Sequence, residues 1–192
     1  MRFKEFNLVE AEQSKFYAAG DSHAQGIASS SHGWINLGVP GAKASGFSTA
    51  SLDKIPAGSI VALSLGHNDA TGSNESPQSI ASHVSSVIDT LVAHKLKVYF
   101  VLFPTGDNEK TFDRNEEVRK AIYAQVKSKV LGVYDLNRGP VGSDKIHAAP
   151  ATYKMLGDFI VNNNTEVRAK GKPSRGATVN PSQVASYLKS KG

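Results

Sequence analysis

Cysteine is absent from the 192-residue sequence, which excludes disulfide bridges, zinc and iron–sulfur sites built on thiolates, and a cysteine nucleophile. No apolar run approaches the roughly 18 residues that a membrane-spanning helix requires. The first residues also lack the apolar stretch of a secretory signal. The sequence therefore predicts a protein with no signal peptide and no membrane span, located in the cytoplasm.

An excess of positive charge is missing from most of the chain, although the net charge is +5. Residues 1–165 hold 16 Lys and Arg against 16 Asp and Glu, so the whole excess lies in residues 166–192. A surface that binds phosphates should carry clustered Lys and Arg on the folded body. We therefore expect one main domain over residues 1–165 with no nucleic-acid partner. A basic flexible linker is expected over residues 166–179.

Five apolar runs alternate with stretches of helical pattern along the main domain. This alternation is typical of a parallel sheet covered by helices on both faces. The runs occupy residues 16–19, 34–37, 60–65, 98–103 and 133–136. The third and fourth runs are almost continuously apolar, as expected for strands buried on both faces. The predicted fold class is α/β.

Helix starts are indicated by local capping signals. Residues 76–77 form a Ser-Pro pair, which is typical of an N-cap followed by proline at the first helical position. Asp113 and Glu116 have the spacing of a capping box, and Pro150 is expected to open another helix. A short C-terminal helix is expected over residues 180–192.

Residues capable of chemistry follow four of the five apolar runs. The carboxyl ends of parallel strands form the usual binding edge of such a sheet, so these side chains are expected to lie near one another. They include Ser22, Gly41, Asn68, Asp144 and His147.

These residue types suit acyl transfer by a serine nucleophile. A serine hydroxyl becomes nucleophilic when an imidazole takes its proton and a carboxylate holds that imidazole in the required tautomer. Asp144 and His147 are three residues apart, so a single turn can present both of them to Ser22. The backbone N–H groups of Ser22 and Gly41 and the side-chain amide of Asn68 are candidate donors for an oxyanion hole.

Four short motifs occur in an order that resembles the SGNH hydrolases, also called GDSL-type esterases. The motifs are Gly-Asp-Ser at 20–22, Asn-Leu-Gly-Val-Pro-Gly at 36–41, Gly-His-Asn-Asp at 66–69 and Asp-x-x-His at 144–147. The resemblance extends over about residues 15–161. It implies a three-layer α/β/α flavodoxin-like fold with a five-stranded parallel sheet.

The resemblance also implies the roles of individual residues. Ser22 would be the nucleophile, His147 the base and Asp144 the residue that orients the base. Gly41 and Asn68 would be oxyanion donors together with Ser22. Ester hydrolysis in this family needs no metal, so no cofactor and no metal site are expected.

The third motif indicates a substrate class. Its Gly-His-Asn-Asp form resembles that of carbohydrate acetylesterases within the family, which implies O-acetyl groups on a carbohydrate as the substrate. His23 stands where the family often has an aliphatic residue. His67 and His23 are therefore candidate residues of the substrate pocket, although His67 could instead fill the loop beside Asn68.

Residues 184–192 resemble the opening helix of lysozyme-like domains in phage tail and virion proteins. This resemblance predicts a virion-associated module of a larger phage protein that degrades cell walls, with a lysozyme-like domain downstream. An O-acetyl group on peptidoglycan or capsule would be the natural target of such a module.

Three other functions remain open. The same family includes hydrolases of lipids and thioesters. A domain of this kind could also bind glycans without hydrolysing them. A two-metal phosphoesterase is the third alternative, because residues 21–23 and 67–69 superficially resemble its metal-binding elements, but the further ligands that such a site needs are missing from the sequence. A dinucleotide or P-loop motif and a Gly-x-Ser-x-Gly elbow are also missing.

Overall fold

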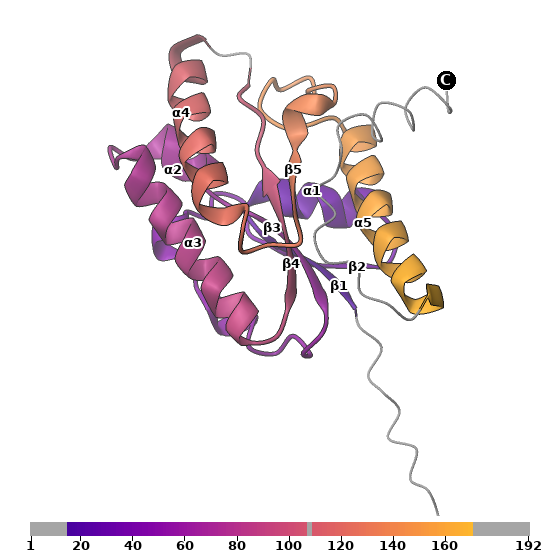
Figure 1. The fold of residues 1–192 in the computed structure, drawn as a ribbon. Coiled ribbons are helices and arrows are strands. Elements are labelled where there is room, and N and C mark those ends of the chain that lie inside the picture. The colour runs from indigo at the N-terminus through magenta and orange to yellow at the C-terminus, as the bar shows by residue number, and fades with distance from the viewer. Residues whose placement is uncertain (1–14, 107–108, 171–192) are drawn as a thin grey trace, which may run out of the picture.

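A single parallel sheet forms the centre of the molecule. The computed structural model describes residues 15–106 and 109–170 (Figure 1). The strands are β1 (Phe16–Gly20), β2 (Trp34–Gly38), β3 (Ile60–Ser64), β4 (Lys97–Leu102) and β5 (Gly132–Asp135). Their order in the sheet is β2-β1-β3-β4-β5, and every neighbouring pair is parallel. The predicted α/β class and the five strands are confirmed.

Helices cover both faces of this sheet. The α-helices are α1 (Ser22–Ser30), α2 (His67–Gly72), α3 (Pro77–Ala93), α4 (Glu109–Val126) and α5 (Pro150–Lys170), and short 3-10 turns are η1 (Ala44–Gly46), η2 (Thr49–Ser51) and η3 (Leu136–Arg138). Figure 1 shows α2, α3 and α4 on one side of the sheet and α1 and α5 on the other. The result is the three-layer flavodoxin-like arrangement that the family resemblance implies. No helix within residues 15–106 and 109–170 has the length and apolar character needed to cross a membrane.

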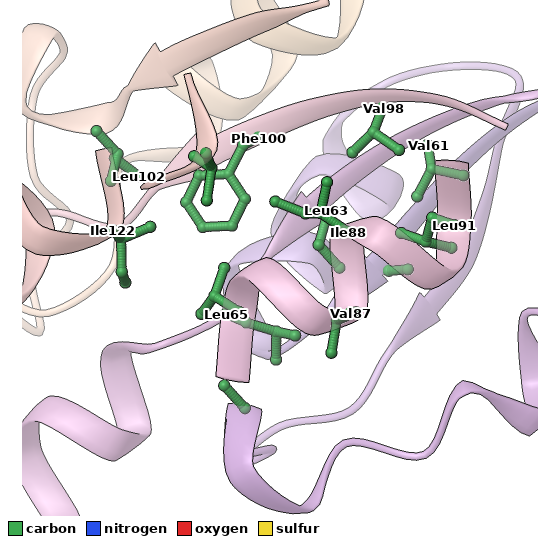
Figure 2. Packing of buried hydrophobic residues seen from close by; sticks show 14 of the residues in the cluster. Val61, Leu63, Leu65, Val87, Ile88, Leu91, Val98, Phe100, Leu102 and Ile122 are labelled. Atoms are coloured by element: carbon green, nitrogen blue, oxygen red, sulfur yellow. The ribbon is translucent and has the colours of Figure 1, made fainter. Parts of the chain in front are cut away.

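Two hydrophobic clusters explain why the central strands are apolar throughout. The larger cluster lies between the sheet and the α3–α4 layer, where Leu63 and Phe100 pack with Ile88 (Figure 2). The smaller cluster lies under α1 and α5 and includes Ile27 and Leu156. Because alternate residues of β3 and β4 enter different clusters, both faces of these strands must be apolar.

The two helix starts with N-cap signals have different outcomes. Ser76 caps α3 as expected, since its hydroxyl accepts a hydrogen bond from the Ser79 backbone N–H at 3.1 Å. The expected capping box at Asp113 is wrong, because α4 already begins at Glu109 and Asp113 lies inside the helix. Tertiary contacts hold the early turns, including the hydrogen bond from the Asn115 amide to the carbonyl oxygen of Thr105 at 2.8 Å.

Helix α5 begins at Pro150, as expected, and continues to Lys170. It therefore crosses the boundary that the sequence suggested at residue 165. The remainder of the expected linker and the short helix over residues 180–192 lie outside the described residues.

The strand order has a switch point at β1, where the chain changes direction across the sheet. The chain runs from β1 to β2 on one side and then crosses to β3 on the other side of β1. Ligands of open α/β sheets bind outside the carboxyl ends of strands at such a switch point. Helix α1 follows β1 after one residue, and α2 follows β3 after two residues, so both begin at this edge.

Candidate active site

Three of the predicted site residues form a hydrogen-bonded series. The Oγ atom of Ser22 lies 2.8 Å from Nε2 of His147, and Nδ1 of the same ring lies 2.6 Å from Oδ2 of Asp144. Ser22 and His147 are 125 residues apart in the sequence. The structure therefore brings together the serine, imidazole and carboxylate in the order that a catalytic triad requires.

Ser22 is held by a tight turn between β1 and α1. Gly20 has a φ angle of +122°, and a Cβ atom at this position would lie 1.8 Å from the carbonyl oxygen of Ser64. That close approach allows the Asp21 N–H to donate to the Ser64 carbonyl at 2.9 Å. Asp21 caps α1 by accepting a hydrogen bond from the His23 N–H at 3.0 Å. Ser22 is thus the first helical residue, where the positive end of the helix dipole favours developing negative charge.

Asp21 is an unusual cap because its carboxyl group is completely buried. Burial raises its pKa to about 7, although the hydrogen bonds from neighbouring groups act in the opposite direction. Its second oxygen, Oδ2, has no hydrogen-bond partner in the part of the chain that the structure describes. Asp21 therefore orders the turn that carries Ser22.

Asp144 and His147 lie in a compact loop before α5. Lys145 adopts a left-handed conformation with φ of +60°, which bends the chain between the two residues. Oδ1 of Asp144 accepts hydrogen bonds from the backbone N–H groups of Ile146 at 3.0 Å and His147 at 2.9 Å. These two bonds, followed by the bond to the His147 ring, hold the pKa of Asp144 well below its usual range. The carboxylate is therefore charged and able to orient the imidazole.

The segment that contains Gly41 is fastened to α2. The side-chain amide of Asn68 donates to the carbonyl oxygen of Ala42 at 2.9 Å, and the buried carboxylate of Asp69 accepts from the Ala44 N–H at 2.8 Å. Lys43 donates to the carbonyl oxygen of Gly72 at the end of α2, at 2.7 Å. These contacts fix the segment after β2 relative to the segment after β3.

The expected oxyanion donors have free N–H groups. The backbone N–H groups of Ser22 and Gly41 have no acceptor among the residues that the structure places. Gly41 has φ of +80°, and a Cβ atom there would meet nothing within 4 Å. Glycine is therefore needed at this position for its backbone conformation, not for space.

Two buried histidines lie beside the triad. His23 and His67 have ring centroids 5.1 Å apart, and the centroid of His23 is also 5.1 Å from that of His147. Burial lowers the pKa of His67 to about 4 and the pKa of His23 well below its ordinary value. Both rings are therefore neutral at pH 7. The structure places these two candidate pocket residues together.

Tyr153 is the site residue that sequence reasoning missed. Its helical spacing assigned it correctly to the core under α5, but its hydroxyl oxygen lies 2.7 Å from Nδ1 of His23 and accepts from the Ala148 N–H at 3.2 Å. Gly26 of α1 makes room for this ring, since a Cβ atom there would lie 2.6 Å from it. No local sequence signal distinguishes this tyrosine from an ordinary core residue.

Metal ligands are not grouped in this region. Within residues 15–106 and 109–170, no cluster of three or more His, Cys, Asp or Glu side chains could hold a metal ion.

Several proteins of known structure share the fold of this chain. No protein-family model matches the sequence, and no curated protein matches it. Among solved structures, a carbohydrate acetylesterase from Sinorhizobium meliloti is 16% identical, with a TM-score of 0.60 over 81% of this chain and 100% of that chain. An aryl esterase from M. smegmatis is 16% identical, with a TM-score of 0.58 over 80% and 99%. A member of the lipolytic G-D-S-L family from Veillonella parvula is 15% identical, with a TM-score of 0.59 over 77% and 96%. The chain therefore has the fold of GDSL-type hydrolases, as its motifs predict.

Proposed function

We propose that this chain is a carboxylic ester hydrolase in which Ser22 is the nucleophile, His147 the base and Asp144 the residue that orients the base. The observation that carries the proposal is the continuous series from Ser22 Oγ through the His147 ring to Asp144 Oδ2. The series lies at the carboxyl edge of a sheet whose fold is shared with solved esterases.

The reaction follows from the contacts of each group. His147 Nε2 takes the hydroxyl proton as Ser22 Oγ attacks the ester carbonyl, and it then gives the proton to the departing alcohol. A water molecule activated by the same imidazole releases the acyl group from Ser22. Asp144 stabilises the imidazolium that forms and keeps the proton of the neutral ring on Nδ1.

Negative charge on the carbonyl oxygen would be stabilised by three donors. The unpaired backbone N–H groups of Ser22 and Gly41 suit this role, and Asn68 adds a side-chain amide of which one N–H is engaged by Ala42. The hydrogen bonds from the Asn68 amide to the Ala42 carbonyl oxygen and from the Ala44 N–H to Asp69 keep Gly41 and Asn68 in a fixed relation before substrate arrives. Such preorganised donors lower the transition-state energy without having to reorient during the reaction.

The substrate we propose is a small acyl ester, in particular an O-acetyl group on a carbohydrate such as peptidoglycan or capsule. The buried ring of His23 packs against His147, and the buried rings of His67 and Phe103 follow it in series, with 5.0 Å between the centroids of His67 and Phe103. These rings fill the space on this side of the triad, which favours a short acyl group over a long chain. The side chains of His147 and Asp144 are 36% and 49% exposed, which suits a bulky alcohol such as a polysaccharide. Two of the solved structures with this fold are a carbohydrate acetylesterase and an acetyl xylan esterase.

Hydrolysis of p-nitrophenyl acetate tests the proposal. We expect Ser22→Ala to lower kcat by about 10⁴-fold or more. The matched control is Ser29→Ala, which removes an exposed hydroxyl from the same helix and should leave kcat unchanged. Equal activity of Ser22→Ala and the wild type, with both proteins folded by circular dichroism, would refute the proposal.

Two further measurements separate the alternatives. Activity that survives EDTA favours the serine mechanism, whereas its loss favours a two-metal phosphoesterase. Acetyl, butyryl and octanoyl esters, followed by acyl thioesters and acetylated glycans, distinguish a carbohydrate esterase from a lipid or thioester hydrolase. Glycan binding without turnover on any of these compounds would identify a binding domain.

A further inference from the structure

The hydrogen-bond directions of His23 and His67 depend on each other, because each neutral imidazole carries one N–H and one acceptor nitrogen. Nε2 of His23 lies 3.4 Å from Nδ1 of His67. Only one of these two nitrogens can hold the proton that joins them. The direction of this hydrogen bond therefore decides which nitrogen of His67 is left as a donor.

The Tyr153 hydroxyl determines the direction of the hydrogen bond between His23 and His67. Its hydroxyl group has one proton, and the oxygen already accepts a hydrogen bond from the Ala148 N–H at 3.2 Å. The other partner of the hydroxyl, in the part of the chain that the structure describes, is Nδ1 of His23 at 2.7 Å. If His23 donated from Nδ1, the phenol proton would have no acceptor in a buried site, which is costly. The hydroxyl therefore donates to Nδ1 of His23.

The hydrogen bond from Tyr153 fixes the proton position first in His23 and then in His67. His23 accepts at Nδ1 and so carries its proton on Nε2, from which it donates to Nδ1 of His67. His67 then carries its proton on Nε2. That atom has no hydrogen-bond partner among the described residues and is not one of the buried unpaired atoms. His67 as a whole residue is 8% exposed, and it immediately precedes Asn68 on α2.

We propose that Tyr153 is a positioning residue that, through His23, holds His67 in the Nε2–H tautomer, so that His67 donates a hydrogen bond to an oxygen of the ester substrate. This inference rests on the proposed function for its substrate, but the tautomers can be measured without any activity. The same hydroxyl also holds Ala148, the residue after the proposed base, so one side chain orders both the base loop and the histidine pair.

Long-range ¹H–¹⁵N spectra of the histidine side chains at pH 7 test the tautomers directly. We expect both His23 and His67 to be protonated at Nε2 and not at Nδ1 in the wild-type chain. Tyr153→Phe removes the donor and should give both rings a measurable population of the Nδ1–H form. Tyr99→Phe is the matched control. Tyr99 has a half-buried hydroxyl that accepts a hydrogen bond at 3.2 Å from Asn164, which lies on α5 like Tyr153. Its spectra should match those of the wild type.

Kinetics with an acetyl ester test the donor. His67→Phe keeps an aromatic ring but has no N–H, and we expect kcat/KM to fall about tenfold, as for the loss of one hydrogen bond. His67→Gln offers an amide N–H near the position of Nε2 and should recover most of this loss. The kcat/KM of Tyr153→Phe should fall by a similar factor, and the kcat/KM of Tyr99→Phe should equal that of the wild type.

Several results would overturn the inference. An Nδ1–H tautomer at His23 or His67 in the wild type refutes the hydrogen-bond direction, whether or not the variants fold. Equal kcat/KM of His67→Phe and His67→Gln refutes the role of the donor. Failure of the proposed function would look different, since Ser22→Ala would then retain activity while the tautomers remained as described.

Discussion

The buried carboxyl group of Asp21 makes a quantitative prediction about stability. Asp21 is fully buried, its Oδ1 accepts the N–H of His23, and its Oδ2 has no partner within residues 15–106 and 109–170. Asparagine is as good an N-cap as aspartate, so Asp21→Asn should keep the cap on α1. The Ser64 hydroxyl lowers the pKa of the same carboxyl group and so lies beside it, and a hydroxyl oxygen can accept a hydrogen bond from the new amide.

The magnitude follows from the change in pKa on folding. Burial raises the pKa of Asp21 from its ordinary value of 3.8 to about 7, which corresponds to about 4 kcal/mol. The folded protein retains a proton that the unfolded chain releases, so the wild type loses stability as the pH rises from about 4 to about 7. The loss is complete above pH 7. The amide in Asp21→Asn does not titrate and avoids this penalty.

Urea unfolding of both proteins at pH 5 and pH 8 measures the effect. We expect Asp21→Asn to be more stable than the wild type at pH 8. Its advantage should be about 2–3 kcal/mol larger at pH 8 than at pH 5, because only part of the penalty is present at the lower pH. The Ser22 site should remain intact in this variant, since the backbone of the turn is unchanged.

Asp69→Asn is the matched control for a buried aspartate. Asp69 is equally buried, but its carboxylate accepts from the Ala44 N–H and from the N–H and hydroxyl of Ser45. An amide would oppose one of these donors, so we expect about 1–3 kcal/mol of destabilisation at pH 8. Asp21→Asn should therefore raise the free energy of unfolding at pH 8, and Asp69→Asn should lower it. An Asp21→Asn difference that is the same at pH 5 and pH 8 would refute the reasoning.

The remaining predictions concern the triad and the glycine turns. Asp144→Asn should lower kcat by about 10³–10⁴-fold with an unchanged circular dichroism spectrum, because the amide favours the wrong tautomer of His147; a kcat near that of the wild type would exclude Asp144 from the triad. Gly20→Ala should unfold at a much lower temperature than the wild type, because its Cβ would lie 1.8 Å from the Ser64 carbonyl oxygen. Gly41→Ala has the space but not the φ angle, and should cost about 1–2 kcal/mol. Equal melting temperatures for these two variants would contradict the steric argument.

The fold was predictable where one strong physical signal dominates a segment. Strands β3 and β4 are buried on both faces, so their sequences are continuous apolar runs. The start of α3 was predictable because Ser76 caps it through a purely local bond. The start of α4 was not, because contacts such as that between Asn115 and Thr105 join segments 10 residues apart and override the local signal at Asp113.

The candidate site was also predictable from the sequence only in part. Ser22, Gly41 and Asn68 could be placed at one edge because each follows a strand of a parallel sheet. The alignment of Ser22 with His147 depends on a loop conformation that no spacing rule specifies. Tyr153 could not be found at all, since apolar periodicity assigns its ring to the core and says nothing of its hydroxyl.

The proposed base illustrates how a loop can match the precision of a helix or strand. Catalytic groups on loops are generally less well fixed than groups on regular elements. The loop that carries His147 is closed, however, by backbone bonds from Gly142 N–H to the His147 carbonyl at 2.6 Å and from Ala149 N–H to the Pro140 carbonyl at 2.8 Å. Between them, the Ala148 N–H binds the Tyr153 hydroxyl of α5. The imidazole is thus held by a short hairpin-like ladder anchored on a helix, and the 2.8 Å contact with Ser22 follows from that anchoring.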